Sequence, residues 1–170
     1  MNVARTDAGL LIELDSEEET ERLGQALADV CDPGCVIGLI GPLGAGKTRL
    51  VRAVAESLGV DPGAIASPTF VLIHEYEGRI PVYHFDVFRL ESPREFEDLG
   101  VADYWSAGGV CLVEWADRVR ALLPVDAWQI RIEPLEPTRR RVEIDFPASA
   151  AVLANQLANC LVCTGVGASV

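Results

Sequence analysis

Residues 41–48 read GPLGAGKT and match the phosphate-loop pattern G-x-x-x-x-G-K-[ST] at every fixed position. The glycines let the backbone turn tightly and approach a phosphate with no Cβ in the way. An apolar run, CVIGLIG (35–41), precedes the loop, and KTRLVRAVAESLG (47–59) follows it with helical character. A buried strand, a glycine loop and a helix in this order predict a nucleoside triphosphate site. In such a site Lys47 reaches the β- and γ-phosphates, and Thr48 places its hydroxyl on Mg²⁺.

The rest of the 170-residue chain alternates between strand and helix periodicity, which predicts one α/β domain. Its expected fold class is a P-loop NTPase-like central mixed sheet flanked by helices. The domain is expected over 1–150, and a C-terminal helix with a flexible tail over 151–170. Further strands are expected at 10–14, 69–78, 79–90, 108–115, 128–134 and 139–146, and helices at 16–31, 92–100 and 148–161. The turn-rich LEPT between the last two strands predicts a hairpin near a sheet edge.

Two carboxylates follow apolar stretches that have the form of buried strands. Asp86 ends VYHFD, and Glu114 follows VCLV. An unpaired charge at such a position is costly to bury, and a metal ion or a water aligned on the γ-phosphate would relieve that cost. The carboxyl ends of strands beside a phosphate-loop strand lie near the nucleotide. Both residues are therefore candidates for metal binding or water activation, with a scaffold ion pair to an arginine as the alternative.

Two further polar residues have a functional and a plain structural interpretation. Thr69 in SPTF (67–70) lies where nucleotide switches carry a threonine that senses the γ-phosphate. The alternative is a turn whose backbone is fixed by Pro68. His84 lies inside an apolar segment, which is more typical of a core histidine than of a catalytic one.

The charge balance limits the partners of the chain. It has 14 Lys and Arg against 26 Asp and Glu, a formal charge of −12, so it should repel polyanions. Direct binding of nucleic acid through a broad basic face is not expected, and any RNA would be held by a partner. We find no secretory pattern and no membrane-spanning apolar run, so a cytoplasmic location is expected. The five cysteines are expected to be reduced, with Cys160 and Cys163 on a final helix rather than in a redox or metal site.

Four motifs occur in the order LGAGKT, SPTF-x-L, YHFD-x-[YF]-R-L and L-V-E-W. In this combination the sequence resembles the bacterial TsaE (YjeE) family over about residues 15–145. The last two motifs are not general phosphate-loop features, so the similarity is specific. That family is the small ATPase subunit of the machinery that makes N6-threonylcarbamoyladenosine at position 37 of tRNAs reading ANN codons.

The resemblance implies ATP and Mg²⁺ as cofactors and assigns roles to individual positions. The implied catalytic residues are Lys47, Thr69, Asp86 and Glu114, and the implied metal-holding residues are Thr48, Asp86 and Glu114. The implied nucleotide-binding residues are Thr20, Gly44, Ala45, Gly46, Lys47, Thr48, Arg49, Trp115 and Arg141. The last of these comes from the run 139–141, RRR, in which the sequence leaves the register open.

The resemblance also implies partners. The family's subunit binds a heterodimer of two proteins of the actin-like kinase fold, TsaD and TsaB, and its ATP turnover resets that complex between rounds. Two other classes of protein remain open at this stage. A small-metabolite or nucleotide kinase would need a lid with several arginines over the acceptor, and the one basic cluster is 139–141. A nucleotide-sensing module would bind the triphosphate without useful turnover.

Overall fold

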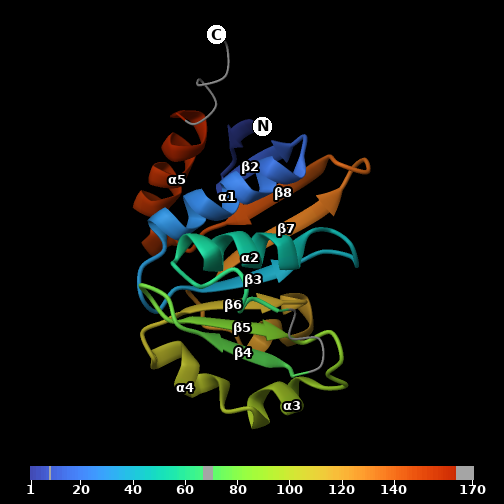
Figure 1. The fold of residues 1–170 in the computed structure, drawn as a ribbon, viewed down its shortest axis with the longest axis vertical. Helices are drawn as coiled ribbons and strands as arrows, with labels where there is room; N and C mark the ends of the chain where they lie inside the picture. The colour runs from blue at the N-terminus through green and yellow to red at the C-terminus, as the bar shows by residue number, and fades with distance from the viewer. Residues whose placement is uncertain (8, 67–70, 164–170) are drawn as a thin grey trace.

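The computed structural model of the chain describes residues 1–7, 9–66 and 71–163, and these form one mixed sheet covered by helices (Figure 1). The strand order is β1-β2-β8-β7-β3-β6-β5-β4. The strands are β1 (Asn2–Arg5), β2 (Gly9–Leu14), β3 (Val36–Ile40), β4 (Ile73–Tyr76), β5 (Val82–Asp86), β6 (Val110–Glu114), β7 (Trp128–Pro134) and β8 (Arg140–Asp145). The helices are α1 (Glu17–Val30), α2 (Lys47–Ser57), α3 (Pro93–Asp98), α4 (Val101–Ser106) and α5 (Ala151–Cys163), with 3₁₀ segments η1 (Ala116–Leu122) and η2 (Ala148–Ala150).

The sheet has a parallel half and an antiparallel half. Strand β3 runs parallel to β6 and to β7, and β5 runs parallel to β6, while the edge strand β4 pairs antiparallel with β5. Strands β7, β8, β2 and β1 then pair antiparallel in succession. Strands β3 and β6 are apolar along almost their whole length because both of their faces are covered. This arrangement brings the carboxyl ends of β3, β5 and β6 to one edge, where the glycine loop begins.

Helices pack on both faces of the sheet. One face carries α1, α2 and α5, whose apolar side chains join those of β2, β3, β7 and β8 in the larger core. The other face, over β3, β5 and β6, is covered by α3, α4 and η1 around Phe85 and Phe96. Ser16 caps the N-terminus of α1, because its hydroxyl accepts the backbone N–H of Glu19 at 3.3 Å. Helix α5 packs on α1, β1 and β2, so it contributes to the same core as the rest of the chain.

The predicted mixed α/β fold is confirmed, and the differences are local. The sequence pattern did not predict β1, α4 or η1. Strand β1 has only four residues, most of them exposed, so it lacks the apolar alternation that marks a strand. The helix expected at 92–100 ends earlier, and α4 follows directly after Gly100, whose φ of +71° breaks the two apart.

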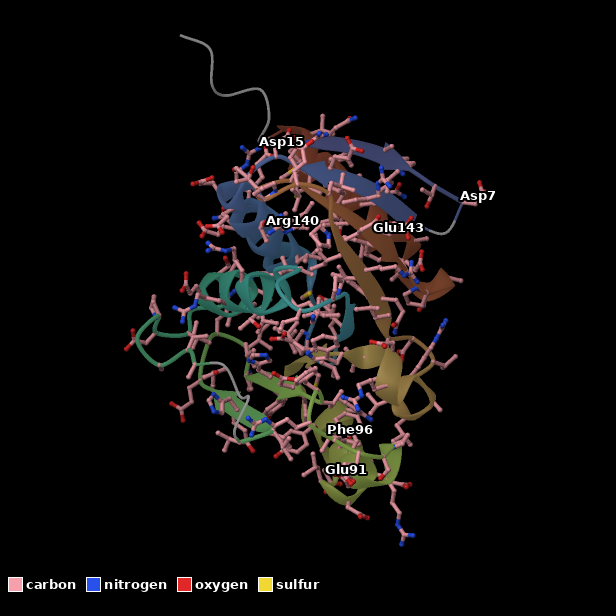
Figure 2. All side chains as sticks on the ribbon, turned by 90° about the vertical axis from the view of Figure 1, so that its right-hand side faces the viewer. Asp7, Asp15, Glu91, Phe96, Arg140 and Glu143 are labelled. Carbon is pink, nitrogen blue, oxygen red and sulfur yellow. The ribbon has the colours of Figure 1, made fainter. Side chains whose placement is uncertain are left out.

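The β7–β8 hairpin is confirmed, and β2 and β1 continue the sheet beyond it. Residues of β8 alternate between two different surroundings. Val142 and Ile144 are fully buried on the face that carries α1, α2 and α5. Residues at odd positions point to the opposite, uncovered face, and Figure 2 shows Arg140 toward the helices and Glu143 on the other side. This alternation decides which basic residue of the hairpin reaches the glycine loop.

Within these described ranges, no helix is long and apolar enough to cross a membrane. Cys31, Cys35, Cys111 and Cys160 are not in disulfide bonds. Among the described residues, no group of three or more His, Cys, Asp or Glu side chains is arranged to hold a metal ion. The predicted tail from residue 164 onward lies outside the described residues.

Candidate nucleotide-binding site

The loop between β3 and α2 has the backbone shape that a phosphate-binding loop needs. Gly44 and Gly46 have φ values of +77° and +106°, a region that residues with a Cβ rarely adopt. Helix α2 begins at Lys47, immediately after the second of these glycines. The first N–H groups of a helix have no partner within it, and together with the helix dipole they attract anions. The loop therefore presents backbone donors to a phosphate group.

Lys47 is held inside the loop. Its Nζ donates to the carbonyl oxygens of Gly41 at 2.7 Å and Pro42 at 3.0 Å. The same atom lies 3.7 Å from the ring centroid of Trp115, which is a cation–π distance. Only 4% of the residue is exposed, and burial lowers the pKa of its ammonium group, an effect that the carboxylates of Glu114 and Asp86 partly offset.

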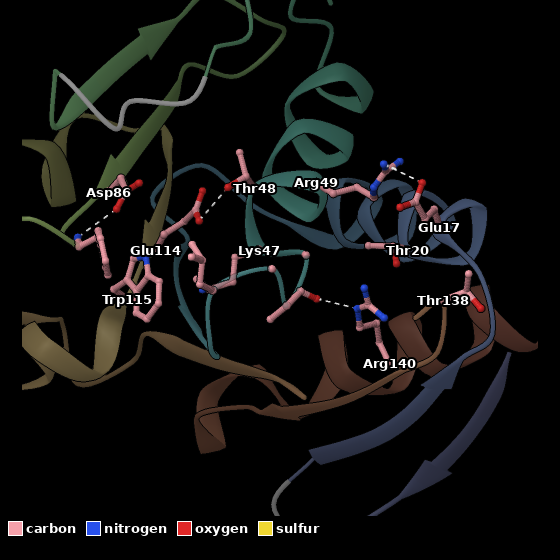
Figure 3. A pocket seen from close by; sticks show the side chains of 15 residues that line it. Glu17, Thr20, Lys47, Thr48, Arg49, Asp86, Glu114, Trp115, Thr138 and Arg140 are labelled. Atoms are coloured by element: carbon pink, nitrogen blue, oxygen red, sulfur yellow. Dashed lines mark hydrogen bonds and ion pairs between the residues drawn. The ribbon is translucent and has the colours of Figure 1, made fainter. Parts of the chain in front are cut away.

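The two predicted carboxylates lie side by side. Asp86 and Glu114 are direct partners in the parallel register of β5 and β6. Glu114 Oε2 accepts a hydrogen bond from the Thr48 hydroxyl at 3.0 Å (Figure 3). Asp86 Oδ1 accepts the backbone N–H of Phe88 at 3.0 Å, which fixes that carboxylate at the strand end.

These oxygen atoms fit the requirements of a magnesium site. Mg²⁺ prefers oxygen ligands and is usually held by one or two carboxylates together with phosphate oxygens and water. Thr48 and Glu114 already place a hydroxyl and a carboxylate oxygen in contact, and Asp86 supplies a second carboxylate beside them. These three residues would hold the ion, which would then supply Lewis-acid stabilisation of charge on a phosphoryl oxygen.

A cavity of about 440 Å³ joins these groups. Figure 3 shows Asp86, Glu114 and Trp115 at one end and Thr20, Thr138 and Arg140 at the other, with Lys47 between them. Its lining residues are Glu17, Thr20, Leu43, Gly44, Ala45, Gly46, Lys47, Thr48, Arg49, Asp86, Phe88, Glu114, Trp115, Thr138 and Arg140. The cavity is thus elongated across the loop, with a carboxylate end and an end built by α1 and the hairpin.

The second end is held together by polar contacts of α1 and α2. Arg49 forms ion pairs with Glu17 at 2.7 Å and Glu21 at 3.0 Å, which tie the two helices together at the rim. Thr20 is 6% exposed, and its hydroxyl contacts the carbonyl of Ser16 at 3.5 Å. A buried hydroxyl at the cavity wall suits recognition of a polar group of a nucleoside.

Of the run 139–141, the structure places Arg140 in the cavity wall, whereas the residue predicted to approach the nucleotide is Arg141. Arg140 lines the cavity and donates from Nε to the Ala45 carbonyl at 3.0 Å. Arg141 points to the opposite face of β8, where it pairs with Glu13 and Glu133, each at 3.6 Å. The alternation of β8 explains this placement, because Arg140 shares the helix-covered face with Val142 and Ile144.

The structure brings most of the predicted site residues together. Those in the cavity wall are Thr20, Gly44, Ala45, Gly46, Lys47, Thr48, Arg49, Asp86, Glu114 and Trp115. Thr69 lies outside the described residues. The cavity wall also contains five residues that were not predicted from the sequence: Glu17, Leu43, Phe88, Thr138 and Arg140. Leu43 and Phe88 belong to the LGAGKT and YHFD-x-[YF]-R-L motifs, so their place in these motifs could have predicted a position near the site. Thr138 lies in the turn between β7 and β8, and only the pairing of these strands brings it to the cavity.

Trp115 has an unusual backbone conformation for a bulky residue. Its φ of +62° and ψ of +37° place it in the left-handed region. Such conformations cost free energy and concentrate at functional sites. This conformation turns the chain at the end of β6, and the Trp115 ring then lies over Lys47 and packs against Phe88, with ring centroids 4.8 Å apart.

Buried polar groups are concentrated at this site. In the described part of the chain, the buried polar or charged residues are Thr20, Lys47, His84, Asp86 and Glu114. Four of them line the cavity, and the fifth, His84, contacts Glu114 at 2.9 Å. Burying such groups costs free energy, so their gathering at one place indicates a functional constraint rather than packing.

The loop, the helix behind it and the carboxylates on the adjacent strands define a phosphate-loop protein of the α/β class. Residues 14–142 match the family model described as "Threonylcarbamoyl adenosine biosynthesis protein TsaE". The chain belongs to this family.

Curated relatives and a solved structure support the assignment. The chain is 44% identical over 132 residues to the tRNA threonylcarbamoyladenosine biosynthesis protein TsaE of Bacillus subtilis, covering 77% of this chain and 80% of that protein. It is 37% identical over 129 residues to the TsaE protein of Treponema pallidum, covering 76% and 95%. The crystal structure of Bacillus subtilis YdiB superposes with a TM-score of 0.72 at 31% identity, over 94% of this chain and 97% of that one.

Proposed function

We propose that this chain binds Mg-ATP and hydrolyses it slowly, and that the turnover serves the threonylcarbamoylation of adenosine 37 in tRNAs that read ANN codons. One observation carries the ATPase part of the proposal: the Thr48 hydroxyl on the glycine loop meets the Glu114 carboxylate on the neighbouring strand at 3.0 Å. That contact joins the phosphate-binding loop to the carboxylate at the end of β6. A carboxylate at this place can hold the metal ion of the triphosphate or orient the attacking water, and both roles serve hydrolysis.

Each group has a defined part in the proposed reaction. Backbone N–H groups of the loop bind the phosphates, and Lys47 exchanges its two loop carbonyls for phosphate oxygens. Glu114 orients the attacking water or holds the metal side of the triphosphate, and Asp86 adds negative charge at the same edge. Positioning and electrostatic stabilisation are the main contributions a protein makes to phosphoryl transfer.

Membership of the TsaE family supports the biological part of the proposal, since the curated relatives are named for tRNA threonylcarbamoyladenosine biosynthesis. We propose that the partner is the TsaD–TsaB heterodimer and that ATP turnover resets this complex between rounds. The formal charge of −12 suits a subunit that leaves tRNA to its partners.

The three arginines of the basic cluster that a kinase lid would require already have partners within the chain. Arg139 pairs with Asp15 at 3.1 Å and Glu136 at 3.0 Å, and Arg141 pairs with Glu13 and Glu133. Arg140 donates to backbone carbonyls of the hairpin and the loop. These contacts favour an ATPase over a metabolite kinase.

The test is ATP hydrolysis by the purified chain, alone and with TsaD, TsaB and tRNA from the same cell. We expect slow turnover alone and a clear change when all partners are present. The same assay on Glu114→Gln separates this chain's turnover from that of a contaminating ATPase. Turnover that ignores the partners but rises with a small phosphate acceptor would contradict the proposal.

A further inference from the structure

His84 is the one buried polar residue of the described chain that does not line the cavity. It is 0% exposed and lies on β5, two residues before Asp86 and on the same face of the sheet. Its Nε2 lies 2.9 Å from Glu114 Oε1, across the β5–β6 pair. The sequence pattern favoured a core histidine, but this contact links it to the acidic residue of the site.

The two oxygens of Glu114 are divided between two partners. Oε2 accepts from the Thr48 hydroxyl at 3.0 Å, and Oε1 faces His84 at 2.9 Å. One partner comes from the glycine loop and the other from the body of the sheet. The carboxylate therefore has its torsion angles fixed from both sides, with one oxygen turned toward the cavity.

The surroundings of the ring indicate which nitrogen carries the proton. His84 Nδ1 is buried, and among the residues that the structure describes it has no hydrogen-bond partner. A proton on Nδ1 would leave a buried N–H donor unpaired, whether the ring were neutral or charged. A neutral ring with its proton on Nε2 leaves only an acceptor unpartnered and lets Nε2–H donate to the carboxylate. Unpaired donors are the rarer case in protein interiors.

We propose that His84 is a positioning residue for Glu114: it donates from Nε2 to Oε1 and so holds Oε2 toward Thr48 and the triphosphate. This inference rests on the proposed ATPase function and adds a residue to it. Partners that fix a metal-binding or catalytic carboxylate in this way typically affect metal affinity or activity by about 10- to 100-fold. His84 does not line the cavity and contacts Glu114, so its effect on the reaction is expected to pass through that carboxylate.

A matched pair of variants tests the contact. The amide nitrogen of Gln in His84→Gln can occupy roughly the place of Nε2, whereas that of Asn in His84→Asn lies near the Nδ1 position and cannot reach Glu114. Both changes bury a neutral amide, so their packing costs are similar. We expect His84→Asn to lower kcat about 10- to 100-fold, with the Kd for ATP little changed, and His84→Gln to restore most of kcat. Equal loss in both variants would overturn the proposal.

A double-mutant comparison separates positioning from general destabilisation. If His84 acts through Glu114, His84→Asn should cause no further loss of kcat in a Glu114→Gln background. Independent, multiplicative losses in the two positions would overturn the proposal. Urea unfolding of each variant shows whether it is folded under the assay conditions.

Nitrogen-15 NMR of the nucleotide-free protein gives a readout that needs no turnover. The chain has two histidines, and the other, His74, contacts the Tyr76 hydroxyl, so a His74 variant assigns the signals. We expect a protonated Nε2 and an unprotonated Nδ1 for His84, and a shift of that Nε2 in Glu114→Gln. A proton on Nδ1 would overturn the proposal. A wild type without ATPase activity would remove the proposed function, while the NMR result on the pair would stand.

Discussion

Charged side chains are placed differently in the parallel and antiparallel halves of the sheet. In the parallel half, β5 and β6 end in buried carboxylates, Asp86 and Glu114, which are 7% and 2% exposed. In the antiparallel half, Arg140 faces the cavity, but Glu13, Glu133 and Arg141 lie on the uncovered face. On that face charged residues pair across strands, as Arg131 does with Glu143 at 2.7 Å. Both side chains of that pair are nearly half exposed.

This difference indicates which charged residues of the molecule are functional. Exposed ion pairs contribute about 0–1 kcal/mol, because water screens them and ordering two long side chains costs entropy. Buried charges are costly unless something compensates them. The parallel half keeps such charges beside a phosphate-binding loop, whereas the antiparallel half only builds a wall for the cavity. Charge substitutions should therefore be severe in the first half and mild in the second.

Glu114→Gln should give the largest effect. The amide keeps the shape of the side chain but removes the negative charge that orients water or holds the metal. We expect kcat to fall by about 100- to 10,000-fold, the range for loss of a general base, with ATP binding retained. Single-turnover hydrolysis and equilibrium ATP binding check this. Normal hydrolysis by the variant would show that Glu114 is not part of the chemistry.

Lys47→Ala should act on binding instead. The ammonium group is expected to contact two phosphates, and hydrogen bonds to charged groups contribute about 1.5–3 kcal/mol each, so the Kd for ATP should rise about 100-fold or more. Because burial lowers the pKa of Lys47, affinity in the wild type should fall, as pH rises, earlier than it would with an exposed lysine. Titration calorimetry over a pH series tests both statements. An unchanged Kd would mean that Lys47 stays on its loop carbonyls when nucleotide binds.

Asp86→Asn should give a smaller effect, confined to magnesium. The Asn side-chain oxygen can still accept the N–H of Phe88, so the turn after β5 should persist and only the charge is lost. We expect the magnesium concentration for half-maximal turnover to rise at least about 10-fold. A magnesium titration of ATPase activity measures this. If the variant and the wild type coincide, Asp86 is a scaffold residue.

Local sequence accounts for the parallel half far better than for the antiparallel half. The loop, Lys47, Thr48 and the two strand-end carboxylates could be predicted because each belongs to a short motif with its own backbone requirement. The contact between His84 and Glu114 could not, since it depends on β5 and β6 being neighbours in register. His84 and Glu114 are thirty positions apart, and no local sequence pattern shows that their side chains meet.

The hairpin shows a second limit of sequence reasoning. The run 139–141 offers three arginines, and the motif alone does not say which of them faces the loop. That choice depends on pairing of β8 with β7 and β2, which places Val142 and Ile144 in the core and so turns Arg140 to the same side. The pairing register of β8 is a tertiary property, and a shift of this register by one residue would exchange the faces that Arg140 and Arg141 occupy.

Arg140→Gln and Arg141→Gln compare the two faces of one strand directly. Arg140 donates to the Ala45 carbonyl and to the Glu136 and Pro137 carbonyls, so it ties the hairpin to the glycine loop. Its loss should weaken ATP binding about 10-fold, equivalent to about 1.4 kcal/mol. Arg141→Gln removes only exposed ion pairs, and it should change the free energy of unfolding by less than about 0.5 kcal/mol and leave the Kd for ATP unaltered.

Measuring ATP affinity and urea unfolding on both variants distinguishes binding from stability. A loss of affinity in Arg140→Gln without a matching loss of stability would mean that the hairpin shapes the nucleotide site through this one guanidinium group. The reverse order, with Arg141→Gln the weaker binder, would mean that the uncovered face of β8 takes part in nucleotide binding. The uncovered face of the antiparallel half would then carry functional charge, and its contrast with the carboxylates of the parallel half would fail.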